Sequence, residues 1–409
     1  MTSSRATPPA ARRERERDGD SDGRADAMRP VVVVGDGPGT PRVDPVTAAR
    51  RAGVDDGILL LGWIVDDRSW IGGLGTWPAL SHQPVTGLAA AATSGRVEYL
   101  PARLASMPAL LHGPLAPAVA VVAGVRRGSG FAFTENVGYA DTAARLAPSV
   151  IVELVDAPDV GAPPIEGNVV EVLDGGPGPV PPAPRNPDET DRRIAAMAAS
   201  VVPEGATVQY GLGRLPEAVV RSIDRRVSVV SGLITDAVVG LRDRGLLVGR
   251  PLGSYVWGGE DLLGMVREGR IRPVGIEELH RDGRLASTPQ FVSINAALEV
   301  GLDGAVNVER AGSRLVAGAG GHPDYCEAAT RSPGGISLVV LPSTHRGRSS
   351  IVAAPTVVST PRTDVHVVVT EHGIADLRGL GEGARRRALL AVADPAHRAH
   401  LERMAAEGA

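Results

Sequence analysis

The chain of 409 residues is 43% apolar and 22% charged, so it can bury a large core and should divide into at least two domains. A net charge of -4 without a basic stripe, together with an aromatic content of 3%, argues against nucleic acid as a partner. The chain contains no lysine, which excludes Schiff-base enzymes and P-loop nucleotidases because both depend on one.

The cellular setting follows from features that the sequence lacks. No apolar run reaches the roughly 20 residues that a membrane span needs, and residues 1–29 are charged where a signal peptide would be apolar. The single cysteine, Cys326, excludes an internal disulfide and a thiolate zinc cage. We therefore expect a cytoplasmic protein with no membrane partner, and we predict no metal site.

The first half of the chain begins after a polar tail. Residues 1–29 are rich in arginine, aspartate and serine with little to bury, and we expect them to be disordered. From 30 to 174, short β-branched runs alternate with alanine-rich helical stretches, which is typical of a parallel sheet covered by helices. The apolar runs that we expect to form strands are 31–34, 57–64, 97–100, 118–124 and 149–156.

A linker rich in proline and glycine, GGPGPVPPAPRNP at 175–187, separates this half from residues 188–409. The same α/β rhythm then restarts, and both halves carry a strand, a glycine turn and a helix. This pattern indicates a duplicated unit with a ligand cleft between its copies. The expected elements are a helix over 188–202, strand-turn-helix units over 206–223 and 229–241, strands within 336–342 and 364–377, and helices near 382–393 and 394–406.

Two glycine loops follow predicted strands. GDGPGTP spans 35–41 and GLGRLP spans 211–216, and either can turn backbone N–H groups toward a phosphate or carboxylate. Gly211 and Gly213 are therefore candidate binding residues, with a simple tight turn as the alternative. Neither loop has the third glycine of a dinucleotide fingerprint, so we predict no nicotinamide cofactor.

The most distinctive motifs lie in the second half. They include FVSINAALEV (291–300), DGAVNVE (303–309), GAGGHPDY (318–325), LPST (341–344) and STPRTDVHVVVTEHGIADLRG (359–379). In this order they resemble the acetyl-CoA hydrolase/transferase family, the group of CoA transferases that includes 4-hydroxybutyrate and succinate CoA-transferases. The resemblance covers about 190 to 400 well and the first half loosely.

The resemblance implies an α/β fold with two CoA-transferase-type domains in tandem, the active site between them, and a homodimer. It also implies a reaction, in which a glutamate attacks the thioester of a small acyl-CoA to form an acyl-glutamyl anhydride. The CoA thiolate then converts this anhydride into an enzyme–CoA thioester, and a second carboxylate collects the CoA. The coenzyme is thus a substrate, and no permanently bound cofactor is expected.

Such a reaction needs backbone N–H donors at the thioester oxygen. The resemblance places these donors in the loop of Gly318, Gly320 and Gly321, where the absence of Cβ lets the backbone approach the thioester closely. A tight turn is the structural alternative. His322 stands where the family typically has glutamine, and is a candidate to orient the thioester or donate to CoA.

The position of the family's glutamate raises a difficulty. Aligned without gaps, SVVSGLITDAVVGL at 228–241 places Gly232 at that position. Sliding the chain instead brings in Asp236, whose carboxylate is one methylene short; a displacement of about 1 Å costs on the order of a hundredfold in rate. We favour the gapless alignment and expect Thr235 or Asp236 to cap the following helix.

Two other side chains are alternatives to the missing glutamate as nucleophile. Ser231 stands near the glutamate position but has no identifiable base, and a lone cysteine such as Cys326 is usually a small buried apolar residue.

The first half offers candidates for the acyl pocket. Phe131, Phe133, Glu135 and Asn136 are expected to face the acyl group.

Three functions remain open. The first is a CoA transferase or acyl-CoA hydrolase acting on a small acyl-CoA. The second is a catalytically impaired acyl-CoA-binding member of the family, which Gly232 favours. The third is a sugar-phosphate isomerase-like protein on a related fold, which leaves the matches over 287–379 unexplained.

Overall fold

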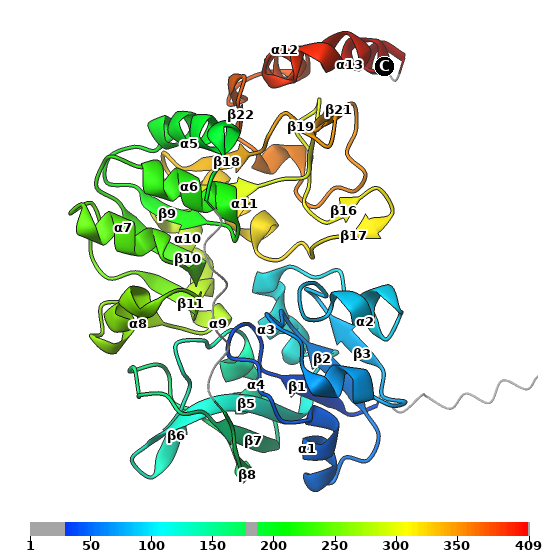
Figure 1. The fold of residues 1–409 in the computed structure, drawn as a ribbon, viewed down its shortest axis with the longest axis vertical. Coiled ribbons are helices and arrows are strands. Elements are labelled where there is room, and N and C mark those ends of the chain that lie inside the picture. The colour runs from blue at the N-terminus through cyan, green and yellow to red at the C-terminus, as the bar shows by residue number, and fades with distance from the viewer. Residues whose placement is uncertain (1–28, 177–185, 408–409) are drawn as a thin grey trace, which may run out of the picture.

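The computed structural model describes residues 29–176 and 186–407. The predicted disordered tail, apart from Arg29, and most of the predicted linker lie outside the described residues. The two halves of the chain, each built on its own sheet, lie one above the other in Figure 1, with the helices α12 and α13 at the far end of the second.

The first half forms an eight-stranded sheet in the order β4-β3-β2-β1-β5-β7-β8, with β6 on β5. Every pair is parallel except the β5–β6 hairpin. Its strands are β1 (Val31–Val34), β2 (Ile58–Leu61), β3 (Ala79–Ser81), β4 (Val97–Tyr99), β5 (Pro117–Arg127), β6 (Gly130–Ala132), β7 (Ser149–Leu154) and β8 (Val169–Asp174). Its helices are α1 (Pro45–Arg51), α2 (Ala89–Thr93), α3 (Met107–Leu111) and α4 (Ala140–Leu146), with short 3-10 turns at Ser69–Gly73 and Leu104–Ser106.

Strand β1 shows why its sequence is four consecutive valines. Successive side chains of a strand point to opposite faces, and both faces of this sheet are covered. Val31 and Val33 join a core shared with α3 and α4, whereas Val32 and Val34 join one shared with α1 and α2. A β-branched residue therefore suits every position of this central strand.

The second half forms another eight-stranded sheet, in the order β12-β11-β10-β9-β13-β18-β22-β23. Only its last pair is antiparallel. Its strands are β9 (Thr207–Tyr210), β10 (Ser228–Ile234), β11 (Leu252–Val256), β12 (Arg272–Pro273), β13 (Phe291–Ala296), β18 (Ile336–Val340), β22 (Val367–Thr370) and β23 (Gly373–Asp376).

Helices and small hairpins complete this half. The helices are α5 (Glu189–Val201), α6 (Arg214–Ser222), α7 (Ala237–Asp243), α8 (Glu260–Arg267), α9 (Ile276–Leu279), α10 (Arg284–Ser287), α11 (His322–Arg331), α12 (Glu382–Val392) and α13 (Pro395–Glu407). The small strands are β14 (Glu299–Gly301), β15 (Val306–Asn307), β16 (Arg310–Ala311), β17 (Arg314–Leu315), β19 (Thr344–His345), β20 (Arg348–Ser349) and β21 (Ile351–Val352), and 3-10 turns lie at Arg281–Gly283 and Arg362–Asp364.

The expected α/β fold with two similar parallel sheets is confirmed. The first sheet ends at Asp174 and helix α5 begins at Glu189, where Asp188 and Asp191 form the predicted aspartate cap as a reciprocal capping box. The predicted strand region 364–377 contains a 3-10 turn and the β22–β23 hairpin.

Backbone contacts hold the two halves together. The N–H groups of Val137 and Gly138 donate to the Ser254 carbonyl at 2.9 and 3.2 Å, and the Ile276 N–H donates to Gly138 at 2.8 Å. On the other side, the Leu104 N–H donates to the Gly320 carbonyl at 2.9 Å. The carboxyl ends of β1 and β10 therefore face a common space.

Candidate active site in the central cleft

A cleft of about 530 Å³ lies between the two halves, and we call it the central cleft. Parallel sheets commonly bind ligands at the carboxyl ends of their strands, and several such ends meet here. The first half contributes residues near β1, β2 and β3, and the second contributes the ends of β9, β10 and β13 and the start of α11. Its lining includes Asp36, Trp63, His82, Gln83, Gly211, Gly232, Leu233, Tyr255, Asn295, Gly318, Gly320, Gly321, His322 and Tyr325.

Six of the sequence-predicted positions line this cleft together. They come from segments far apart in the chain, namely Gly211, Gly232, Gly318, Gly320, Gly321 and His322. Gly213 does not line it: this residue precedes α6 with φ of +135° and no side-chain cap, so it serves the turn.

Gly232 lies within β10, and the space beside it is already filled. A Cβ atom built there would stand 2.8 Å from the hydroxyl of Tyr325, which is itself buried. Real Cβ contacts are essentially never that close. A glutamate at position 232 therefore requires Tyr325 to move.

Asp236 does not line the central cleft. Its two carboxylate oxygens accept the Gly259 N–H at 3.0 and 3.2 Å, which ties the start of α7 to the start of α8. Asp236 stands at the N-cap position of α7, but its side chain makes no capping hydrogen bond there. Of the two residues expected to cap α7, Thr235 makes the contact, because its Oγ1 accepts the Ala237 N–H at 3.4 Å, whereas the Asp236 carboxylate is held by Gly259.

The glycine loop before α11 separates into two roles. Gly320 has φ of +54°, which a side chain would strain, and it is fixed through its carbonyl by Leu104. Neither the Gly320 N–H nor the Gly321 N–H has an acceptor among the residues that the structure describes. Gly321 is the N-cap of α11, and a helix N-terminus favours negative charge. Gly321 is therefore the better placed of the two to meet a developing oxyanion.

His322 is buried and electrically neutral. Its Nδ1 lies 2.8 Å from Thr360 Oγ1, while its Nε2 is buried without a partner in the described part of the chain. Burial lowers the pKa of His322 to about 4. At neutral pH it is therefore a hydrogen-bonding group and carries no charge.

Neither alternative nucleophile is activated. Cys326 is fully buried, and burial raises the pKa of its thiol to about 12, so the reactive thiolate does not form at neutral pH. Ser231 donates its hydroxyl to the Tyr210 carbonyl at 3.0 Å and accepts the Tyr210 N–H at 3.4 Å. Both residues are therefore structural.

Sequence reasoning missed an acid–base cluster on the first-half side of the cleft. Asp36 follows β1 and is 3% exposed, and the Tyr255 hydroxyl of β11 donates to its Oδ2 at 2.7 Å. His82 Nε2 lies 4.0 Å from the same oxygen. Asp36 is the one charged residue in the loop GDGPGTP, and this was the available signal. Nothing local pointed to Tyr255 or His82.

Burial changes the ionisation of both groups. It raises the pKa of Asp36 to about 7, although the Tyr255 hydrogen bond opposes the rise. It lowers the pKa of His82 to about 4, so this imidazole is neutral at pH 7. The Asp36 carboxyl, by contrast, can bind and release a proton near neutral pH.

The four residues expected to face an acyl group lie elsewhere. Phe133 is buried in the main hydrophobic core, and Phe131 packs under the Arg126 guanidinium, 5.6 Å from the ring centre. Neither lines the central cleft, and this corrects the expectation. Glu135 and Asn136 line a separate cavity of about 370 Å³, the side cavity.

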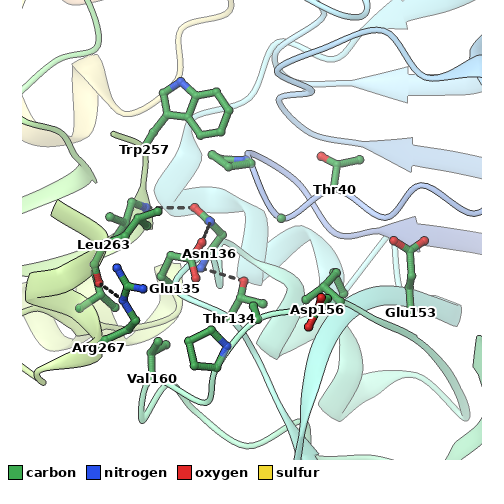
Figure 2. A pocket seen from close by; sticks show the side chains of 18 of the residues that line it. Thr40, Thr134, Glu135, Asn136, Glu153, Asp156, Val160, Trp257, Leu263 and Arg267 are labelled. Atoms are coloured by element: carbon green, nitrogen blue, oxygen red, sulfur yellow. Dashed lines mark hydrogen bonds between the residues drawn. The ribbon is translucent and has the colours of Figure 1, made fainter. Parts of the chain in front are cut away.

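Figure 2 shows the side cavity, with Asn136 between Glu135 and the strand end at Trp257. The Asn136 side chain donates to Glu135 at 3.0 Å and accepts the Val256 N–H at 3.0 Å. Asn136 therefore joins the two halves. Burial raises the pKa of Glu135.

The described residues contain neither a membrane-spanning helix nor a cluster of metal ligands. None of the helices in 29–176 and 186–407 is long and apolar enough to cross a membrane. The same residues hold no cluster of histidine, cysteine, aspartate or glutamate suited to a metal ion.

Sequence comparisons identify relatives. The chain is 28% identical over 229 residues to 4-hydroxybutyrate coenzyme A transferase of Clostridium kluyveri, covering 52% of this chain and 53% of that protein. It is 27% identical over 340 residues to succinyl-CoA:cyclohexane-1-carboxylate CoA transferase of Geobacter metallireducens, covering 76% of each. The chain spans about half the length of several curated relatives that it matches, including the Clostridium kluyveri enzyme.

Solved structures share the fold. RipA from Yersinia pestis superposes with a TM-score of 0.81 at 22% identity, over 94% of this chain and 95% of that one. The 4-hydroxybutyrate CoA-transferase of Porphyromonas gingivalis superposes with a TM-score of 0.72 at 23% identity, with the same coverage. Residues 265–405 match the family model of the acetyl-CoA hydrolase/transferase C-terminal domain. The family resemblance drawn from the sequence is thus confirmed, with the match to the family model lying in the carboxyl-terminal region.

Proposed function

We propose that this protein binds a small acyl-CoA in the central cleft and cleaves its thioester, with water or a carboxylate as the acceptor. One observation carries the proposal: Gly211, Gly232 and the loop 318–321 line one cleft, although they are far apart in the chain. Glycine lets a bulky thioester approach the backbone closely. The relatives are named as CoA transferases and acetyl-CoA hydrolases, which supports the same chemistry.

The proposed geometry puts the thioester carbonyl oxygen at the Gly321 N–H. This donor stabilises the negative charge that develops when a nucleophile adds to the carbonyl carbon. The neutral His322 imidazole lies beside it and can donate or accept a hydrogen bond.

The route through a covalent glutamyl intermediate is not part of the proposal. Position 232 is glycine, and the Tyr325 hydroxyl occupies the space of a side chain there. We therefore favour direct attack by water. The water oxygen bonds to the carbonyl carbon, the C–S bond breaks, and the water proton ends on the CoA sulfur, giving a free acid and CoA.

A second candidate is an acyl-CoA-binding protein without turnover. The closed space beside Gly232 favours it, because the family's nucleophile is missing and its place is blocked. In that case the cleft serves as a sensor site or acts with a partner subunit. The homodimer and the cytoplasmic location also remain predictions, and light scattering on the purified protein tests the first.

Three measurements on the purified chain separate these outcomes. Calorimetry with CoA, acetyl-CoA, butyryl-CoA and succinyl-CoA measures binding, and a dissociation constant above about 1 mM for all four would refute the proposal. Thiol release, followed with a chromogenic disulfide, measures cleavage with and without acetate as acceptor. Intact mass after borohydride treatment reveals a covalent CoA adduct, which we expect to be absent.

Binding with thiol release and no adduct supports direct attack. Binding without release supports the second candidate. An adduct within residues 229–237 would overturn the gapless alignment that places Gly232 at the glutamate position.

A further inference from the structure

The surroundings of Asp36 are shaped to hold one carboxyl group. A Cβ atom on Gly62 would stand 2.4 Å from the Cβ of Asp36, and one on Gly138 would stand 2.1 Å from its Oδ1. No other residue type fits at either position without displacing Asp36. The carboxyl group is therefore enclosed on two sides; its side chain is 1% exposed, and the residue forms part of the wall of the central cleft.

The cluster is incomplete in its hydrogen bonding. Asp36 Oδ1 and both ring nitrogens of His82 are buried and have no partner within the described residues. Buried polar atoms are nearly always paired, so each exception calls for an explanation. The unpaired atoms of both residues lie at the wall of the same cleft, where a bound water or substrate can pair with them.

Other buried carboxylates of this protein are fully engaged. Asp191 accepts the Asp188 N–H at 3.0 Å and pairs with Arg214 at 2.9 Å. Glu153 accepts the backbone N–H groups of Arg42 and Val43 at 2.7 and 2.6 Å. Among the described residues, Asp36 has the Tyr255 hydroxyl as its one side-chain hydrogen-bond donor and no arginine partner, although backbone N–H groups near it also lower its pKa. Its environment therefore suits proton exchange better than structural support.

From this arrangement we propose that Asp36 is the general base of the central cleft, positioned by Tyr255, with His82 helping to hold the attacking water. The inference rests on the proposed thioester cleavage and names the group that drives it. It also explains how a member of this family can act without the glutamate at position 232.

The proton balance of the step is complete. The Asp36 carboxylate takes one proton from water while the water oxygen bonds to the thioester carbonyl carbon. The tetrahedral intermediate collapses with the electrons of the C–S bond leaving on sulfur. Asp36 then returns its proton to the CoA thiolate, so the products are a carboxylic acid and CoA, and the enzyme is unchanged.

The ionisation of the cluster is compatible with this role. The groups that face Asp36 are Tyr255 from β11, His82 after β3 and Tyr139 before α4. All three are neutral at pH 7, because burial lowers the pKa of His82 and raises that of both tyrosines. The proton of Asp36 is therefore exchanged near neutral pH, where the pKa of the carboxyl group lies.

The test compares two isosteric variants by thiol release and by calorimetry with acetyl-CoA. Asp36→Asn should lower kcat at least about a hundredfold and change the Kd of CoA less than about threefold. Asp141→Asn is the matched control: Asp141 is also a largely buried acid with a pKa raised to about 6, but it does not line the cleft. It should keep the wild-type kcat.

Tyr255→Phe provides an independent readout. The Tyr255 hydrogen bond lowers the pKa of Asp36, so its loss should move the acidic limb of the kcat profile to higher pH. A structural role alone would not shift this limb. If Asp36→Asn does not fold, as judged by circular dichroism, this shift decides the question.

Every other outcome overturns the proposed function, the role of Asp36, or both. Wild-type protein that does not bind acyl-CoA overturns the proposed function itself. Wild-type protein that binds but releases no thiol overturns the proposed cleavage together with the role of Asp36, whereas an Asp36→Asn variant that keeps its kcat overturns only the role of Asp36. A rise confined to KM for acyl groups with a polar tail would show that Asp36 recognises the acyl group, and would also overturn its role as base.

Discussion

The hydroxyl oxygen of Tyr325 lies 2.8 Å from the point that a Cβ atom on Gly232 would occupy. Gly232 comes from a strand and Tyr325 from a helix on the face of the sheet, so their contact is part of the packing between the two. The position that the gapless alignment assigns to the family's glutamate therefore carries no carboxylate, and Tyr325 fills the space beside it.

Gly232→Ala should therefore destabilise the protein by about 1–3 kcal/mol, because overpacking a buried site forces its neighbours to shift. Tyr325→Phe removes the clashing oxygen and leaves the nearest ring atom at 3.6 Å, an ordinary contact. In the Tyr325→Phe background, Gly232→Ala should therefore lower the free energy of unfolding much less than it does in the wild type. Urea unfolding of the four proteins measures this coupling, and strictly additive effects would contradict it.

Gly240→Ala is the matched control for that experiment. Gly240 lies in α7, and a Cβ there meets no atom within 4 Å. Alanine is favoured over glycine inside a helix by roughly 0.5–1 kcal/mol. We expect this variant to be at least as stable as the wild type.

The free energy of unfolding should depend on pH, and comparison with an Asp36 variant should isolate the contribution of this residue. The pKa of Asp36 in the folded state, about 7, lies above the ordinary aspartate value of 3.8, so between these pH values the folded state holds a proton that the unfolded state has lost. This favours folding at low pH, and the contribution declines by about 1.4 kcal/mol for each pH unit as pH rises from about 4 to about 7.

Asp36→Asn cannot titrate and should lack this decline. The stability of the variant relative to the wild type should therefore increase from pH 4 to pH 7 and stay level above. Unfolding in urea at four pH values checks the trend. A difference that does not vary with pH would contradict the raised pKa.

Cys326 should be unreactive in the folded protein. Burial raises the pKa of its thiol to about 12, and no part of the residue is exposed. Modification with a chromogenic disulfide should be slow in buffer and fast in denaturant. Rapid modification of the native protein would show that the thiol opens to solvent.

Tyr99→Phe should weaken acyl-CoA binding. The Tyr99 hydroxyl of the first half donates to the largely buried Glu309 at 2.7 Å and accepts the Ala319 N–H at 3.2 Å, next to Gly320. Its loss leaves a buried carboxylate oxygen without this donor, at a cost of about 1–3 kcal/mol. We expect a lower unfolding free energy together with a higher Kd for acetyl-CoA. Loss of stability with unchanged Kd would show that the loop is positioned without Tyr99.

Much of the fold was predictable because its signals are local. The four valines of β1 and the aspartate cap of α5 are readable from neighbouring residues, and both were predicted correctly. The glycine loop before α11 was found in the same way, through a motif of consecutive residues. Phe133 was misassigned because an aromatic residue in a loop-like stretch fits a pocket wall and a core equally well until its neighbours are known.

The sequence by itself determined the fold class and the family resemblance of the carboxyl-terminal region, because periodicity and motif order are properties of adjacent residues. That Gly232 stands at the position of the family's glutamate remains a prediction of the gapless alignment. Only the tertiary structure decided which side chains share the cleft. Asp36 and Tyr255 are 219 positions apart, and their hydrogen bond exists because two parallel sheets turn their strand ends toward each other. The burial that shifts the pKa of Asp36 comes from the same packing, which no local pattern records.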